Sequence, residues 1–242
     1  MAEKFRLDVF IFQKGLVPSR SKATALIMEG KVSVNDKIIT KSGFSVSEND
    51  NISIKETDEF VSRGGIKLKK ALEEFAVNVK DKVCIDVGAS TGGFTECLLR
   101  SGAKKVYCID VGYGTLDSKL RNDLRVVNIE KTNIRYFDKN LLKEEIDIAV
   151  IDVSFISLEK VLPTVKELVK KNGEIIALLK PQFEAPRGST KKGVVKDENV
   201  RQQTIEKIKL FSGSIGLKLI NETDSPIKGP KGNLEYFLYL KV

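Results

Sequence analysis

The 242-residue sequence contains no histidine, and its only cysteines are Cys84, Cys97 and Cys108. Without histidine the chain lacks the commonest general base, so Ser-His and Cys-His catalytic dyads are excluded. The three cysteines form no Cys-x-x-Cys pair, which removes the usual ligands of a structural zinc ion. We therefore expect no metal site, and any catalysis must depend on Lys, Asp, Glu, Tyr or a single Cys.

Long hydrophobic runs are also missing, since no apolar stretch approaches the ~20 residues that a membrane-spanning helix needs. Residues 1–15 carry charges inside their apolar segment and have no small-residue cleavage site, unlike a signal peptide. We therefore expect a cytoplasmic protein without membrane contact. Hydrophobic residues make up 41% and charged residues 31%, which is ordinary for a chain with a packed core, and the length allows a small domain followed by a larger one.

Basic residues outnumber acidic ones, with 41 Lys and Arg against 33 Asp and Glu, which gives a net charge of +8. Clustered basic side chains gain free energy by displacing the counterions that surround phosphates, so this excess favours a polyanionic partner. Charge alone does not distinguish RNA from DNA or from anionic lipid.

The N-terminal segment combines helical and strand-like patterns. Apolar residues at helical spacing predict one helix over residues 5–16 and a second over residues 22–29. Alternation over residues 31–39, broken by Asn35-Asp36, predicts a short hairpin, and residues 51–55 predict one more strand.

Three short motifs in this segment resemble the S4 RNA-binding domain: R-L-D at residues 6–8, S-R-S-K-A at 19–23 and G-K-V-S-V-N at 30–35. The resemblance implies that basic side chains of the two helices and the hairpin contact structured RNA. The implicated residues are Arg6, Arg20, Lys22, Lys31 and Lys41. A solvated basic face on a small helical domain is the alternative. The polar residues 57–59 are the expected linker, which gives an RNA-binding domain over 1–59 and a second domain over 60–242.

Apolar strands alternate with helical stretches in the second domain. The predicted strands cover residues 83–87, 105–109, 125–128, 146–151, 174–179 and 218–222. This alternation predicts an α/β fold with a parallel, doubly wound, Rossmann-like sheet. Residues 234–240 are a candidate for the antiparallel strand that methyltransferase sheets add to this pattern. An amphipathic helix before the sheet would carry Lys67 near its start.

A glycine-rich turn, D-V-G-A-S-T-G-G-F at residues 86–94, joins the first strand of this domain to a helix. Such a turn lets a ligand approach the backbone closely and directs free helix N–H groups at it. The glycines follow G-x-S-x-G-G and not the G-x-G-x-x-G of NAD-binding folds, and Asp86 would repel a pyrophosphate. A cationic ligand without phosphates fits better, which favours S-adenosylmethionine. A merely structural turn in an NAD-type or inactive fold is the alternative.

Asp110 ends the next strand, where a carboxylate is expected to bind the ribose diol of the cofactor. The complete set of expected cofactor-binding residues is Asp86, Gly88, Ser90, Gly92, Gly93, Phe94, Asp110, Asp152 and Phe155.

Two later strands end in charged residues, Asp152 and Lys180. Ligands of an open sheet bind at the carboxyl ends of its strands, so both side chains should face one cleft beside the cofactor. A lysine that a carboxylate holds and orients can act on a proton without help from histidine.

These two residues, with Lys67 in S-R-G-G-I-K-L and Glu235 in G-N-L-E-Y-F, resemble the Lys-Asp-Lys-Glu tetrad of the FtsJ-like ribose 2'-O-methyltransferases. Together with V-G-A-S-T-G-G-F-T-E, D-V-G-Y-G and the S4-like segment, they make the whole chain similar to the TlyA family, whose members also carry the label hemolysin. The resemblance implies methylation of cytidine 2'-hydroxyls in ribosomal RNA. Lys180, oriented by Asp152, would position and help deprotonate the hydroxyl, while Lys67 and Glu235 hold the ribose.

The chain departs from the family pattern at Thr115, where D-V-G-Y-G is followed by Thr and not Gln, and it ends at Val242. In the family the shorter form acts on the large-subunit site, so we expect activity on 23S rRNA ahead of 16S rRNA. The Gly- and Lys-rich residues 185–193 are predicted to be mobile and to hold RNA phosphates through Lys191 and Lys192, with an idle solvated loop as the alternative. Arg63 is a further expected RNA contact.

Proteins with other functions would show different sequence features. Amino-group methyltransferases usually carry an N/D-P-P-Y/F loop, whereas the corresponding strand end here reads D-V-S-F, and cytosine C5 enzymes need a nucleophilic cysteine. A non-catalytic RNA-binding or assembly factor would keep the basic domain but would not need Asp86, Asp110 and the tetrad together. A pore-forming haemolysin would need a membrane-spanning run. A monomer is the favoured oligomeric state.

Overall fold

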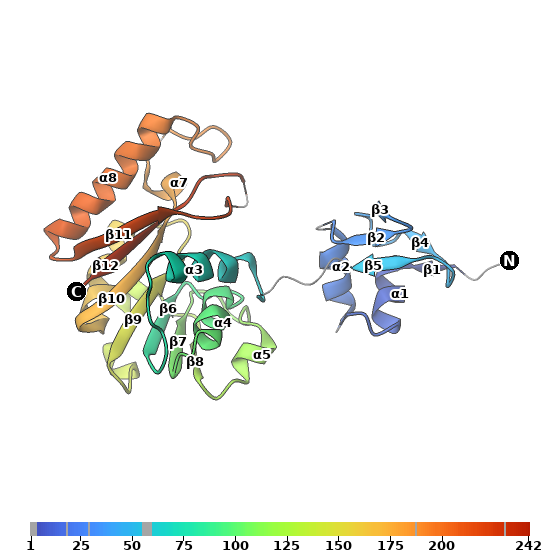
Figure 1. Ribbon diagram of the computed structural model, residues 1–242, viewed down its shortest axis with the longest axis horizontal. Helices are drawn as coiled ribbons and strands as arrows, with labels where there is room; N and C mark the ends of the chain where they lie inside the picture. Colours follow the sequence, from blue (N-terminus) through green and yellow to red (C-terminus); the bar gives the residue numbers. More distant parts are fainter. Residues whose placement is uncertain (1–3, 18, 29, 55–59, 187, 230) are drawn as a thin grey trace. The chain divides into compact units, whose positions relative to one another are not determined.

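The computed structural model describes residues 4–17, 19–28, 30–54, 60–186, 188–229 and 231–242, without the side chains of Lys22 and Ala25. The chain forms two compact units, Met1–Asp58 and Glu59–Val242, which are drawn in Figure 1. The predicted linker at 57–59 lies outside the described residues.

The N-terminal unit is a small α+β fold. In chain order it contains β1 (Phe5–Arg6), α1 (Leu7–Gln13), α2 (Arg20–Met28), β2 (Val32–Val34), β3 (Lys37–Ile38), β4 (Ser45–Val46) and β5 (Ile52–Ile54). Strand β2 pairs antiparallel with both β3 and β5. Asn35 and Asp36 both have positive φ, 49° and 65°, as the two-residue turn of such a hairpin requires, so the predicted hairpin is confirmed.

The prediction of a helix from Phe5 was wrong at its start. Phe5 and Arg6 form an antiparallel strand with Val46 and Ser45, and the helix begins only at Leu7. The partner strand is about forty positions away, and local periodicity does not register such a pairing. Leu7, Phe10 and Ile11 of this helix are buried, as the helical spacing of its apolar residues requires.

The C-terminal unit is built on a seven-stranded sheet with the order β11-β12-β10-β9-β6-β7-β8. Its strands are β6 (Val83–Val87), β7 (Lys105–Ile109), β8 (Val126–Ile129), β9 (Ile146–Ile151), β10 (Val169–Leu179), β11 (Lys218–Asp224) and β12 (Tyr236–Lys241). Strands β8, β7, β6, β9 and β10 run parallel, and β12 lies antiparallel to both β10 and β11. The predicted α/β sheet and its late antiparallel strand are confirmed. Strand β10 begins five residues before the predicted Glu174, with an irregular register between Val169 and Glu174.

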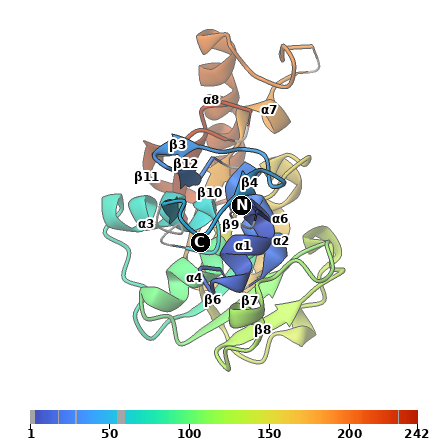
Figure 2. The same cartoon turned by 90° about the vertical axis from the view of Figure 1, so that its right-hand side faces the viewer.

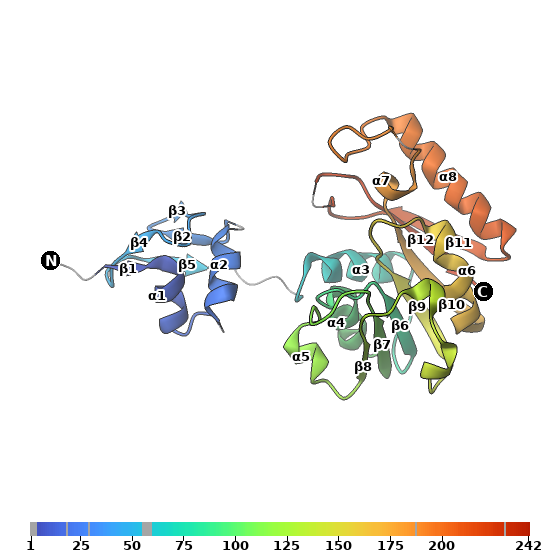
Figure 3. The same cartoon turned by 180° about the vertical axis from the view of Figure 1, so that it is seen from behind.

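Helices cover both faces of this sheet. They are α3 (Arg63–Glu74), α4 (Gly93–Arg100), α5 (Ser118–Arg121), α6 (Leu162–Leu168), α7 (Pro181–Glu184) and α8 (Glu198–Ser214), with single turns η1 (Ile134–Tyr136), η2 (Lys139–Leu141) and η3 (Leu158–Lys160). Helices α3 and α4 pack on one face, and α6 and α8 on the other. Figure 2 shows α3 and α6 on opposite sides of β9 and β10, and Figure 3 shows α6 and α8 from behind.

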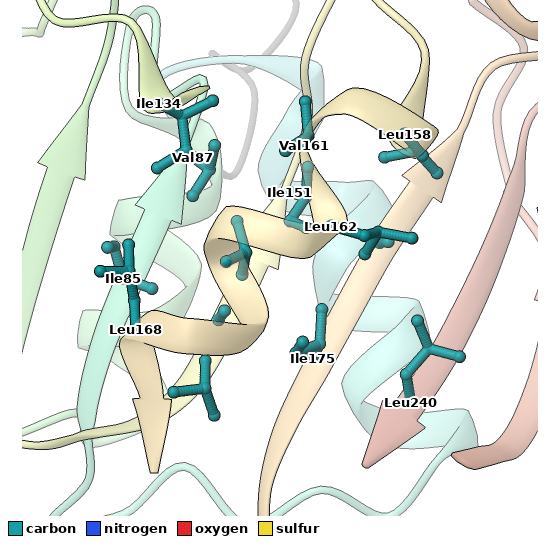
Figure 4. Packing of buried hydrophobic residues seen from close by; sticks show 14 of the residues in the cluster. Ile85, Val87, Ile134, Ile151, Leu158, Val161, Leu162, Leu168, Ile175 and Leu240 are labelled. Carbon is teal, nitrogen blue, oxygen red and sulfur yellow. The ribbon is translucent and has the colours of Figure 1, made fainter. Parts of the chain in front are cut away.

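The two-sided cover explains the composition of the central strands. All five residues of β6 are buried, because alternate side chains enter different apolar clusters. Figure 4 shows Leu162 and Leu168 of α6 beside Ile85, Ile151 and Ile175 of the sheet. The one charged residue in β6, Asp86, is completely buried. It lies at the carboxyl end of the strand, so a buried carboxylate is placed at the sheet edge where ligands bind.

Candidate active site

Lys180 and Asp152 form an ion pair at the carboxyl edge of the sheet. Asp152 follows β9 and Lys180 follows β10, and these neighbouring strands run parallel with Ala177 beside Ile151. Lys180 Nζ lies 2.5 Å from Asp152 Oδ1 and donates a hydrogen bond of 3.1 Å to Ser154 Oγ. The Lys180 side chain is only 11% exposed. Its ammonium group is therefore held in place by one ion pair and one hydrogen bond.

Lys67 and Glu235 form a second, more deeply buried pair. Lys67 lies in the second turn of α3, a helix whose N-terminus is capped by the Ser62 hydroxyl, which accepts a hydrogen bond from Gly64 N. Lys67 Nζ lies 2.5 Å from Glu235 Oε2, and the two side chains are 8% and 1% exposed. Because β12 is antiparallel to β10, Glu235 at its beginning lies at the same edge of the sheet as Lys180.

All four residues line one cleft of about 620 Å³. The same cleft is bordered by the glycine-rich turn, by the start of α3 and by the loops before α8 and β12. The structure therefore brings together the four residues that the sequence suggested as catalytic. It also places Arg63 at this cleft, whereas Gly92, Asp86 and Asp110 do not line it.

A second cleft of about 850 Å³ adjoins the first and shares the side of it formed by Gly88, Ser90, Asp152 and Phe155. Asp110 lines this second cleft. Its carboxylate accepts hydrogen bonds from Ser90 N at 2.8 Å and from Gly112 N at 2.6 Å, so the backbone fixes its orientation.

Gly88 is a position where a side chain cannot be placed. Its φ is +88°, and a Cβ atom there would lie 2.5 Å from the carbonyl oxygen of Asp152. The turn therefore lies directly against the end of β9, leaving a floor made of backbone at the junction of the two clefts. A bulky ligand can approach such a floor closely.

Asp86 lies beneath this floor. Its Oδ2 accepts a hydrogen bond of 2.7 Å from the Thr95 hydroxyl, whereas its Oδ1 is buried and has no hydrogen-bond partner among the described residues. Burial raises the pKa of Asp86 to about 7, and the nearby carboxylates of Asp152 and Asp110 act in the same direction. A buried carboxylate without a counter-charge is compensated when a cation binds nearby, so the site fits a positively charged ligand.

Glu184 ties the loop after β9 to the segment that follows Lys180. It closes α7, and its Oε1 accepts a hydrogen bond of 2.7 Å from Leu158 N. Burial raises the pKa of this carboxyl group as well. The contact attaches the loop after β9 to the segment that follows the active-site lysine, and Ser154 and Phe155 of this loop line both clefts.

Several residues of the site were not predicted from the sequence. Thr95 could have been found from its position on the buried face of α4, one turn before Leu98 and Leu99. Ser154 and Asn233 each lie two residues from a predicted site residue and therefore on the same side of an extended chain. Gln182, Phe183, Thr190 and Lys231 also line the first cleft, and they follow no spacing that would have identified them.

The residues predicted to bind RNA fall into separate groups. Asp8, 2% exposed, is paired with both Arg6 and Arg20, at 3.0 Å and 2.9 Å, and each arginine side chain remains more than half exposed. Lys41 is exposed and Lys31 is partly exposed. The side chain of Lys22 lies outside the described residues, and the exposed Lys191 and Lys192 belong to the C-terminal unit.

Within the described ranges no helix is both long and apolar enough to cross a membrane. The same residues contain no group of three or more Cys, Asp or Glu side chains that could hold a metal ion. Cys84, Cys97 and Cys108 are buried and unbridged.

Comparison with known proteins covers both units. Residues 60–242 match the model of the FtsJ-like methyltransferases, and residues 5–52 match that of the S4 domain. The chain is 44% identical to hemolysin A of Brachyspira hyodysenteriae, covering 97% of this chain and 98% of that protein. It is 41% identical to the 16S/23S rRNA (cytidine-2'-O)-methyltransferase TlyA of Mycobacterium tuberculosis, covering 100% and 91%. A solved structure of a Streptococcus thermophilus protein described as a hemolysin aligns with a TM-score of 0.78 at 38% identity, covering 100% and 89%.

Proposed function

Because this chain belongs to the TlyA family, in which an S4 domain is joined to an FtsJ-like methyltransferase domain, we propose that it methylates the 2'-hydroxyl of cytidine in ribosomal RNA. The cofactor is S-adenosylmethionine, and the expected substrate is 23S rRNA, with 16S rRNA as a second site. The observation that carries the proposal is the pairing of Lys180 with Asp152 and of Lys67 with Glu235 around one cleft beside the glycine-rich turn.

The fit of the cofactor rests on Asp86, Gly88 and Asp110. Asp86 supplies an uncompensated carboxylate beneath the turn, and Gly88 lets the turn pack against the end of β9 so that backbone forms the floor. The fixed carboxylate of Asp110 can accept hydrogen bonds from the ribose hydroxyls. The remaining cofactor residues of the proposal are those of the turn and of the β9 loop: Ser90, Gly92, Gly93, Phe94, Asp152 and Phe155. When bound, S-adenosylmethionine supplies an electrophilic methyl group on its sulfonium.

Lys180 is the proposed catalytic residue that acts on the acceptor hydroxyl. An ammonium group close to the 2'-oxygen stabilises the negative charge that develops as the hydroxyl releases its proton to water. Asp152 and Ser154 hold Lys180 in one orientation, while Lys67 and Glu235 provide a rigid donor and acceptor for the ribose on the other side of the cleft. Fixing both reactants in line supplies a large share of the acceleration, up to about 7–11 kcal/mol in favourable cases.

The division of labour follows the two units. Residues 1–59 are proposed to bind structured RNA through Arg6, Arg20, Lys22, Lys31 and Lys41, and residues 60–242 to catalyse the reaction. Asp8 supports this role because it holds two exposed guanidinium groups side by side, where they can contact phosphates. We further propose that the protein acts as a monomer in the cytoplasm, where ribosomes are assembled, and without a metal ion.

The test is transfer of labelled methyl groups from S-adenosylmethionine to purified ribosomal subunits and to naked rRNA. We expect incorporation into large-subunit RNA, and mass mapping should place the methyl group on a cytidine ribose. RNA binding without any methyl transfer would favour a non-catalytic assembly factor instead. Leakage of liposomes at physiological salt would favour the haemolysin that some relatives are named for.

The raised pKa of Asp86 predicts how cofactor binding depends on pH. With a pKa of about 7, Asp86 is roughly 10% ionised at pH 6 and roughly 90% at pH 8. A cation binds to the ionised form, so the affinity for S-adenosylmethionine should increase about tenfold from pH 6 to pH 8. The stability of the cofactor-free fold changes in the opposite sense. The unfolded chain ionises Asp86 near its ordinary value, so stability falls as the pH rises from about 4 to about 7.

Calorimetric titration of wild type and Asp86→Asn at several pH values is the measurement. The Asn variant keeps an acceptor for Thr95 and should bind weakly with no pH dependence over this range. Asp147→Asn, which alters an aspartate at the opposite end of β9, is the matched control and should behave like wild type. Equal affinities of the wild type at pH 6 and pH 8 would remove Asp86 from the cofactor site.

A further inference from the structure

Asn233 is a buried polar residue to which neither the sequence motifs nor the tetrad assigns a role. It is 3% exposed and lies two residues before Glu235. Its Oδ1 accepts a hydrogen bond of 3.0 Å from Val195 N, and its Nδ2 donates one of 2.9 Å to Gly193 O. One side chain thus satisfies both a donor and an acceptor of a loop about forty residues earlier in the chain.

That loop is a tight turn at the border of the active-site cleft. Lys191 and Val194 exchange backbone hydrogen bonds, of 2.9 Å and 3.1 Å, and the two residues between them, Lys192 and Gly193, have positive φ. This is the geometry of a two-residue hairpin turn, which places its central side chains outward. Lys191 and Lys192 are both exposed, while Gly193 lines the cleft.

The segment before β12 contributes a second loop beside this turn, as Figures 1 and 3 show. The backbone of Asn233 accepts a hydrogen bond of 2.9 Å from Gly229 N, and a Cβ atom at Gly229 would lie 2.4 Å from Glu235 Oε1. The Lys231 side chain lies close to the hairpin turn at residues 191–194. A Cβ atom placed on Gly193 of this turn would be 3.3 Å from Lys231 Nζ. Asn233 therefore joins the two loops to each other and to the strand that carries Glu235.

We propose that residues 189–195, 228–229 and 231–233 form one basic lip that holds the phosphates next to the target ribose, and that Asn233 is the positioning residue that keeps this lip in register with Glu235 and Lys67. The proposal rests on the proposed function. The lip carries the exposed lysines Lys191, Lys192, Lys228 and Lys231, and none of them forms an ion pair with a residue that the structure describes. Unpaired lysines at the mouth of a cleft are available to an RNA backbone, whose phosphates flank every 2'-hydroxyl.

The anchored hairpin turn also changes how the lysines of the loop would hold RNA phosphates, because residues 185–193 were predicted to do so as a mobile segment. A loop that only clamps phosphates by moving would need no buried anchor. Here the hairpin turn is closed by its own backbone and fastened by an amide, so the lysines are presented from a fixed support. Preorganised charges lose less conformational freedom when RNA binds, and this favours affinity as well as correct placement of the ribose.

The experiment measures binding of fluorescently labelled 23S rRNA fragments and large subunits at several salt concentrations, for wild type, Asn233→Ala and Lys191→Ala/Lys192→Ala. We expect Asn233→Ala to weaken binding about tenfold and to reduce the slope of log K against log[salt] by roughly 1 to 2, as the double lysine variant does. The three substitutions combined should be no worse than Asn233→Ala alone, because they remove the same interaction. In methyl transfer, KM for RNA should rise more than kcat falls, with cofactor affinity unchanged.

Asn233→Gln guards against loss of folding, because it adds no charge and keeps an amide donor and acceptor, displaced by one methylene from Gly193 O and Val195 N. It should show an intermediate salt slope. Asn221→Ala, on the exposed face of β11, is the matched control and should leave binding unchanged. Wild-type slopes for both Asn233 variants, or effects that add to those of the lysine variants, would overturn the proposal. Binding is measured without methyl transfer, so a wild type that binds RNA but transfers no methyl group would count against the function and not against the lip.

Discussion

Lys180→Met is expected to lower kcat for methyl transfer by about 10²- to 10⁴-fold, the range typical of a group that assists proton loss in the transition state. Methionine keeps the length of the side chain and removes only the ammonium group that lies between Asp152 Oδ1 and Ser154 Oγ. The Asp152 side chain is 22% exposed although its Oδ1 is buried, so a rotation of the carboxylate can bring the oxygen that loses its partner to water. Folding and cofactor binding should therefore survive.

Lys170→Met is the matched control for this variant. Lys170 belongs to the same strand, β10, and its Nζ also lies 2.5 Å from an aspartate, Asp147, of the neighbouring strand. This pair sits at the opposite end of the strands from the clefts, so its loss should leave kcat near the wild-type value. Single-turnover rates at saturating cofactor, together with calorimetric cofactor binding, separate chemistry from binding. A folded Lys180→Met protein that binds the cofactor and transfers methyl groups at an undiminished rate would contradict the assignment.

The sheet and the position of the site could be predicted from the sequence because each rests on local patterns. Strands buried on both faces read as short apolar runs, and the carboxyl ends of parallel strands meet at one edge. Asp86, Asp110, Asp152 and Lys180 each follow or end such a run, so their arrangement along that edge follows from the topology. The antiparallel β12 extends the same argument to Glu235.

Pairings between distant segments could not be predicted in this way. Strand β1 was read as part of a helix because its partner, β4, is two residues long and has no pattern of its own. The hydrogen bonds of Asn233 to Gly193 and Val195 depend on how two loops pack, which no spacing within either loop encodes. For α3, periodicity alone leaves three candidate lysines, and tertiary packing selects one of them. Lys67 is buried against Glu235, whereas Lys69 and Lys70 are exposed.

Because Lys67 is buried against Glu235, its substitution is expected to lower the stability of the fold strongly. Lys67→Met leaves Glu235, which is 1% exposed, as a buried carboxylate without a counter-charge, and its second oxygen already lacks a hydrogen-bond partner among the described residues. Loss of one member of a buried pair costs about 3–5 kcal/mol of unfolding free energy. For a unit of this size the melting temperature should fall by roughly 6 to 20 °C. Lys70→Met tests the same substitution on the same helix in the exposed Lys70–Glu74 pair and should cost less than about 1 kcal/mol.

The double variant Lys67→Met/Glu235→Met distinguishes structure from catalysis. Replacing a buried ion pair by apolar side chains of similar length is often neutral, because the cost of removing both charges from water disappears with the charges. Thermal unfolding should therefore recover most of the stability that Lys67→Met loses. Methyl transfer should not recover, since neither methionine can donate to or accept from the ribose hydroxyls. Recovery of activity together with stability would mean that this pair only supports the fold, and the reaction would then depend on Lys180 and Asp152 alone.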